Sequence, residues 1–168
     1  MKKTGLVIID MQNGFINAYT MHLPEQIKKF IMTHDFDSII ATRYCNTPET
    51  PCYQDGWTEC MNGTPAAELV PELSGLTTAI FEKHIYSAFT PEFSDFILHK
   101  QLEKLYFCGV NTDCCVLASV FSCYDKNQDC TVIADLCAST LGTRIHENAL
   151  EILRGNITRE KVILSGTI

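Results

Sequence analysis

The chain has 168 residues, of which 46% are hydrophobic and 20% charged, and its formal net charge is −7 at pH 7. This composition is typical of globular domains and excludes disordered, collagen-like and membrane-embedded chains. Nucleic-acid binding requires clustered lysine and arginine side chains, so the acidic balance argues against a nucleic-acid partner. We expect a single domain over residues 1–168, with no nucleic-acid or membrane partner.

The N-terminal segment places two lysines before an apolar run of about five residues, which is too short for a signal-peptide core or a membrane span. We therefore expect a cytoplasmic protein. An odd number of cysteines without a secretion signal indicates reduced thiols, most of them packed like small hydrophobic side chains. The nine cysteines are Cys45, Cys52, Cys60, Cys108, Cys114, Cys115, Cys123, Cys130 and Cys137.

Short apolar runs alternate along the chain with segments of helical spacing. The first run, residues 4–9, is continuously apolar, as expected of a parallel strand buried on both faces. A helix is predicted for residues 24–34, with Pro24 near its start. The other predicted strands are 38–42, 78–81, 105–108, 131–134 and 162–164, and the other helices are 91–102, 113–126 and 143–153. This order predicts an α/β fold, a three-layer α/β/α domain with a central, mainly parallel six-stranded sheet of Rossmann-like type.

The connection over residues 44–75 departs from this alternation. It is rich in proline and glycine and is long for a connection in a compact domain. We expect it to form a rim or a movable lid over a functional site.

Three polar residues follow predicted strands at the edge where parallel α/β sheets bind ligands. Asp10 directly follows the first strand, Lys83 closes the third, and Cys115 lies a few residues beyond the fourth. We expect the three side chains to face one crevice. The plainer readings are that Asp10 bonds a neighbouring loop, that Lys83 is a solvated strand end, and that Cys115 is core packing.

The surroundings of Cys115 favour nucleophilic chemistry. Thr112 or Asp113 is suited to cap the helix that begins there, so Cys115 would lie in its first turn. A helix N-terminus stabilises anions, and we expect it to lower the pKa of the thiol. Backbone N–H groups of Asn111 and Cys115 would be free to bind an oxyanion, while Asp10 accepts the thiol proton.

Four segments of the chain resemble the isochorismatase-like cysteine hydrolases, in the same order and at similar separations. They are IIDMQNGF (8–15), NGTPAAEL (62–69), FEKHIYSAF (81–89) and GVNTDCCV (109–116). The resemblance implies the isochorismatase-like hydrolase fold, the catalytic residues Asp10, Lys83 and Cys115, and an oxyanion hole built from the backbone N–H groups of Asn111 and Cys115. It also implies a cis peptide bond before Asn111 and a homo-oligomer, in which a neighbouring subunit can complete the pocket.

The same resemblance separates this chain from parts of the family. Its TDxCV pattern selects Cys115 and leaves Cys114 at a variable position. The Asp-x-His metal motif of nicotinamidases is replaced by ATRYCNTPE, so we expect no metal site. Members named for isochorismate hydrolysis commonly lack the nucleophilic cysteine that this chain has. Cleavage of an amide, carbamoyl or ureide C–N bond is therefore the expected reaction, with no cofactor and a small-molecule substrate.

Five residues near strand ends or in the long connection are further candidates for lining a substrate pocket. They are Asn13, Phe15, Tyr44, Trp57 and Phe89. A rival reading is a catalytically silent or thiol-redox-sensing binding protein of the same fold, although the chain has no CxxC motif. A structural zinc site of Cys45, Cys52 and Cys60 would lack closely paired ligands.

Overall fold

The computed structural model describes residues 2–168 and contains a six-stranded sheet with strand order β3-β2-β1-β4-β5-β6. Every neighbouring pair of strands is parallel. The strands are β1 (Thr4–Ile9), β2 (Ser38–Tyr44), β3 (Ala79–Lys83), β4 (Lys104–Val110), β5 (Asp129–Ala138) and β6 (Val162–Ile163). The predicted six-stranded parallel sheet is thereby confirmed.

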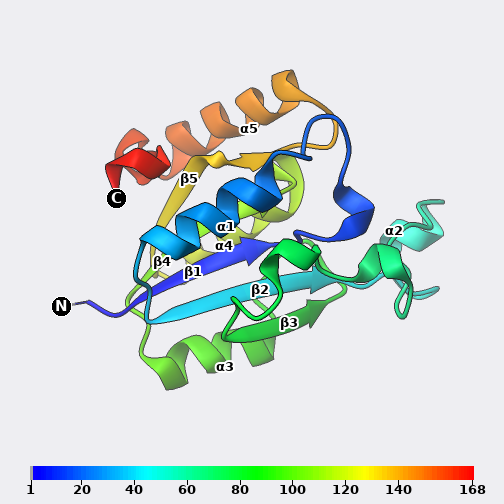
Figure 1. Cartoon of the computed structure of the whole chain (residues 1–168), viewed down its shortest axis with the longest axis horizontal. Helices are drawn as coiled ribbons and strands as arrows, with labels where there is room; N and C mark the ends of the chain where they lie inside the picture. Colours follow the sequence, from blue (N-terminus) through cyan, green and yellow to red (C-terminus); the bar gives the residue numbers. More distant parts are fainter. Residues whose placement is uncertain (1) are drawn as a thin grey trace.

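Helices cover both faces of this sheet, with α1 on one face and α4 on the other (Figure 1). The helices are α1 (Leu23–Thr33), α2 (Pro51–Gln54), α3 (Pro91–Lys100), α4 (Leu117–Asp125) and α5 (Thr143–Asn156). The helix predicted for residues 113–126 starts later than expected. The segment Thr112–Val116 winds as a π-helical turn, and α4 begins only at Leu117.

The core follows from the apolar runs that the sequence contains. The side chains of β1 from Leu6 to Ile9 are fully buried, because helices pack on both faces of the strand. Helix α1 adds an apolar stripe of Leu23, Ile27 and Phe30. Each such side chain contributes about 1.5–3 kcal/mol when removed from water. No helix within residues 2–168 is long and apolar enough to cross a membrane.

Gly109 allows β4 to approach β1 closely just before the strands end. Its φ is 110°, and a Cβ atom at this position would lie 2.2 Å from the carbonyl oxygen of Ile9. A side chain here would collide with backbone, so only glycine fits. The register of β4 against β5 also shifts between Phe107 and Gly109. These irregularities set the direction of the chain at the edge of the sheet.

The long connection after β2 is fastened to the sheet by a buried amide. The side-chain Nε2 of Gln12 donates to the carbonyl oxygens of Tyr44 (2.9 Å) and Ala67 (2.8 Å). Its Oε1 accepts from the backbone N–H of Tyr44 at 2.8 Å. The last turn of the connection, Pro71–Leu73, contacts α1, whereas the part that carries α2 lies beyond the carboxyl ends of β2 and β3 (Figure 1). It forms a rim there, and its movement as a lid stays a prediction.

Candidate active site

Asp10 is fixed immediately after β1. Its φ of 47° lies in the left-handed region, which turns the chain sharply at the edge of the sheet. The carboxylate Oδ1 accepts a hydrogen bond from Thr42 Oγ1 at 2.6 Å, and the backbone N–H of Asp10 donates to the same hydroxyl oxygen at 3.2 Å. The side chain is fully buried. A residue of the neighbouring strand β2 therefore orients this carboxylate.

Lys83, the last residue of β3, lies between the other two predicted residues. Its Nζ is 2.8 Å from Asp10 Oδ2 and donates to Cys115 Sγ at 3.4 Å. It also donates to the carbonyl oxygens of Ile85 (3.0 Å) and Tyr86 (3.1 Å). Burial alone would lower the pKa of Lys83, but the charge of Asp10 and the contact with Cys115 raise it above its ordinary value. The ammonium form is therefore held in place.

Cys115 lies in the π-helical turn that follows β4, and only 6% of its surface is exposed. Neither predicted cap is formed, because Asn111 occupies the N-cap position and the turn has no side-chain cap. The hydroxyl of Thr112 instead pairs with Nδ1 of His146 at 2.8 Å. The Oδ1 atom of Asp113 is buried, and no residue from 2 to 168 gives it a hydrogen bond.

The prediction of a lowered pKa for the Cys115 thiol was wrong. A hydrogen bond with the thiol of Cys114, burial and the charge of Asp10 raise this pKa well above its ordinary value, and the ammonium of Lys83 offsets them only in part. The same contact lowers the pKa of Cys114. The Cys114 contact and burial therefore both disfavour the thiolate form of Cys115. This direction favours the protonated thiol of Cys115.

The chain before Cys115 has the geometry that the resemblance implies, since the peptide bond between Val110 and Asn111 is cis. The carbonyl oxygen of Asn111 accepts from the N–H groups of Cys114 and Val116, both at 3.0 Å. Its side-chain Oδ1 accepts from the N–H of Thr140 at 2.7 Å. These bonds fix the backbone beside the thiol, and the use of its N–H groups as an oxyanion hole stays a prediction.

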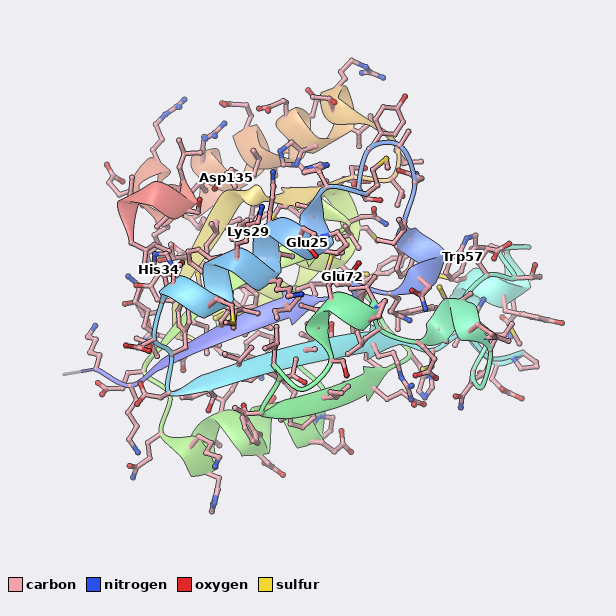
Figure 2. The ribbon with its side chains drawn as sticks, viewed as in Figure 1. Glu25, Lys29, His34, Trp57, Glu72 and Asp135 are labelled. Carbon is pink, nitrogen blue, oxygen red and sulfur yellow. The ribbon has the colours of Figure 1, made fainter. Side chains whose placement is uncertain are left out.

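A cavity of about 510 Å³ opens beside Cys115. Three of the five predicted pocket residues line it, namely Phe15, Tyr44 and Trp57. Trp57 lies at the edge of the sheet toward which the strands point (Figure 2). The ring of Trp57 stacks on Phe15 with 5.9 Å between centroids and lies 5.8 Å from that of Tyr44. The predicted cavity thus has an aromatic side.

The structure does not bring the other two predicted pocket residues to the cavity lining. Asn13 is held by the long connection, since its Nδ2 donates to the carbonyl oxygen of Pro65 at 3.0 Å. Phe89 packs edge-on against Phe93, with 5.1 Å between the ring centroids. Both lie near a strand end, but their side chains turn toward neighbouring protein groups.

Sequence reasoning did not name the remaining residues of the lining as pocket residues, although it named Asp113, Cys114 and Cys52 in other contexts. These are Gly14, Asn17, Cys52, Asp55, Tyr86, Asp113, Cys114, Thr140 and Leu141, besides Asn111 and Cys115, which it named for another role. Asp113 and Tyr86 lie inside two of the matching segments, so adjacency to the predicted residues was an available signal. Cys52 lies in the short helix α2, Asp55 directly follows it and Leu141 lies in a loop, and no local pattern marks these residues.

The comparisons with known proteins concern the family and the fold of the chain. A family model described as the Isochorismatase domain matches residues 4–162. Isochorismatase domain-containing protein 2 of Xenopus laevis is 31% identical over 71 residues, which are 42% of this chain and 35% of that protein. The match therefore spans about a third of the length of that curated relative.

Several solved structures share the fold over nearly the whole chain. An isochorismatase-like hydrolase from Alkaliphilus metalliredigens has a TM-score of 0.86 at 18% identity, covering 98% of this chain and 96% of that one. N-carbamoylsarcosine amidase from Thermoplasma acidophilum has a TM-score of 0.84 at 21% identity, with 99% and 98% covered. Nicotinamidase from Bacillus subtilis has a TM-score of 0.82 at 23% identity, with 96% and 99% covered. With the family model covering almost its entire length, the chain belongs to the isochorismatase domain family.

Proposed function

We propose that the protein is a cysteine hydrolase that cleaves a C–N bond of a small amide, carbamoyl or ureide-type compound, with Cys115 as the nucleophile. The observation that carries this proposal is the position of the Lys83 ammonium, 2.8 Å from Asp10 Oδ2 and 3.4 Å from Cys115 Sγ, beside a cavity. Family membership supports hydrolysis, and two relatives in fold are named as a nicotinamidase and a carbamoylsarcosine amidase.

The first half of the proposed reaction forms a thioester. Asp10 takes the proton of the Cys115 thiol and becomes a neutral acid, while the ammonium of Lys83 stabilises the thiolate that forms. The thiolate attacks the substrate carbonyl, and the N–H groups of Asn111 and Cys115 stabilise the oxyanion of the tetrahedral intermediate. The C–N bond then breaks, and the leaving nitrogen takes the proton from Asp10. Ammonia or an amine is released, and the acyl group stays on sulfur.

The second half regenerates the free thiol. Asp10 removes a proton from a water molecule, whose oxygen attacks the thioester carbonyl. The C–S bond breaks, Cys115 recovers the proton from Asp10, and the acid is released. The raised pKa of Cys115 fits this sequence, because a thiol that keeps its proton at rest requires the carboxylate at each turnover.

Ammonia release from a panel of small amides, carbamoyl compounds and ureides tests the proposal. The wild type should release ammonia from at least one class, and Cys115→Ser should lower the rate by about a thousandfold or more. The variant Asp125→Asn, on the exposed end of α4, is a matched control that should keep the wild-type rate. Silence of the wild type across the panel would favour a binding protein of the same fold.

A further inference from the structure

The cavity beside Cys115 has an unusual balance of charge. Two carboxylates line it, those of Asp55 and Asp113, and neither takes part in an ion pair among the described residues. Within residues 2–168, the lining contains no lysine, arginine or histidine. The nearby ammonium of Lys83 is already paired with Asp10 at 2.8 Å. The cavity therefore carries negative charge that the protein leaves uncompensated.

Aromatic side chains border the same space. Phe15, Tyr44, Trp57 and Tyr86 all line it, and the rings of Phe15 and Trp57 are nearly parallel, with 6° between their planes. The ring of Tyr44 already has one cation beside it, because Lys83 Nζ lies 5.2 Å from its centroid. Aromatic faces attract cations, and rings gathered around one space are a recognised way to bind alkylated ammonium groups.

Two buried polar atoms of the lining residues have no hydrogen-bond partner among the described residues. One is the hydroxyl of Tyr44, whose side chain is 3% exposed, and the other is Oδ1 of Asp113. Buried polar groups are nearly always satisfied, so an unsatisfied one beside a cavity points to a ligand. Tyr44 offers a donor and Asp113 an anionic acceptor, and both belong to the wall of the same cavity.

We propose that the substrate is a cation: a small amide or carbamoyl compound that carries an ammonium or alkylated ammonium group, with Asp113 as its principal ionic partner. This inference rests on the proposed function, because it names the substrate class of the same site. Asp113 precedes the nucleophile by two residues in the same turn, so a cation beside it lies close to the reacting carbonyl. Asp55, at the exposed end of α2, would attract the ligand from solvent.

The charge balance also works against the opposite class of substrate. A carboxylate-bearing amide would meet two carboxylates and no basic side chain of the lining to receive it. Like charges a few ångströms apart repel strongly in a partly desolvated cavity. The Asp10 and Lys83 charges cancel, and the neutral Cys115 thiol adds none, so the triad does not reverse the sign.

Three probes of similar size separate the charge of the substrate from its shape. They are trimethylammonioacetamide, its neutral isostere tert-butylacetamide, and the anion succinamate. Binding to Cys115→Ala is measured by titration calorimetry at low salt, so that the result does not depend on turnover. The cation should bind about tenfold or more tightly than the neutral isostere, and succinamate more weakly than either. Equal binding of the cation and its isostere, or no binding of the cation, would overturn the inference.

Substitution of the acidic side chain identifies the partner. In the Cys115→Ala background, Asp113→Asn keeps the shape of the side chain and removes its charge, so the ratio of cation to isostere affinity should fall about tenfold. The control Asp125→Asn should leave the ratio unchanged, because this residue is exposed on α4 and outside the cavity lining. An unchanged ratio in Asp113→Asn would overturn the assignment of Asp113.

The same probes keep this inference separate from the proposed function. If the wild type hydrolyses tert-butylacetamide or succinamate faster than the cation, the hydrolase proposal stands and the cationic substrate class falls. If Cys115→Ala prefers the cation but the wild type releases ammonia from no amide, the binding preference stands and the hydrolase proposal falls.

Discussion

The site is built from two regions of different character. The buried triad of Asp10, Lys83 and Cys115 comes from the end of β3, the residue after β1 and the π-helical turn after β4, and each member is at most 6% exposed. The cavity wall of Phe15, Tyr44, Asp55 and Trp57 comes largely from turns and from the long connection, and Trp57 and Asp55 reach solvent. An ion pair and a hydrogen bond hold the side chains of the triad together, whereas the aromatic side chains of the wall pack against one another. Reaction chemistry is therefore expected to depend on the triad and substrate choice on the wall.

The largest expected effect comes from removing the ammonium of the triad. In Lys83→Met, the carboxylate of Asp10 stays buried without its partner, so the free energy of unfolding should fall by about 3–5 kcal/mol. Turnover should fall by about a thousandfold, because the thiolate and the carboxylate lose their shared cation. Urea denaturation and amide turnover measure the two effects.

The double variant Asp10→Asn with Lys83→Met separates stability from activity. Without an unpaired charge, it should recover much of the lost unfolding free energy while staying inactive. A single Lys83→Met variant with wild-type stability and turnover would refute the role given to the ion pair.

The pH dependence of thiol alkylation distinguishes the triad from its neighbour. The raised pKa of Cys115 means that the protonated thiol predominates below and around the ordinary cysteine pKa, and that the thiolate increases only as pH rises beyond it. Its alkylation by iodoacetamide should increase about tenfold per pH unit, roughly a hundredfold from pH 7 to 9, without levelling off. Tandem mass spectrometry should show that Cys114, whose pKa is lowered, levels off earlier. A plateau for Cys115 below pH 8 would show that its thiolate is stabilised at rest.

The close approach of β4 to β1 under the triad can be tested with a single methyl group. Gly109→Ala places a Cβ atom 2.2 Å from the Ile9 carbonyl oxygen at a positive φ, so it should cost about 1–3 kcal/mol of unfolding free energy or more. Gly155→Ala, within α5, meets no atom within 4 Å and should be neutral or stabilise by up to about 1 kcal/mol. Equal melting temperatures for the two variants would contradict this account of Gly109.

The smallest effect is expected in the wall. Trp57→Ala removes a ring that packs against Phe15 and Tyr44, so KM should rise by about tenfold while kcat changes little. Tyr53→Ala is the control, because this aromatic residue of α2 is exposed and outside the lining. If Trp57→Ala lowers the melting temperature but leaves KM unchanged, Trp57 contributes to stability and not to substrate binding.

The gathering of Asp10, Lys83 and Cys115 at one edge of the sheet could be predicted from the sequence, because each of them lies at or shortly beyond the end of a predicted strand. The apolar run of residues 4–9 has the same first and last residues as β1. Parallel strands bring their carboxyl ends to one edge of the sheet. The contacts of Lys83 with Asp10 and Cys115 are consistent with this geometric expectation.

The wall and the electrostatics could not be predicted in the same way. Asn13 and Phe89 are near strand ends, as Phe15 is, but side-chain packing turns them to other partners. The direction of the Cys115 pKa depends on burial and on the Cys114 contact, which spacing does not reveal. Loop conformation likewise decides that Asp55 reaches the cavity.

The most direct test of the central claim is the mass of the acylated protein. An amide that the wild type hydrolyses is mixed with excess enzyme, quenched in acid and digested, and the modified residue is located by fragmentation. The account predicts an acyl group on Cys115, present in wild type and in Cys114→Ala and absent in Cys115→Ala. An acyl group on Cys114, or an adduct that persists in Cys115→Ala, would contradict it.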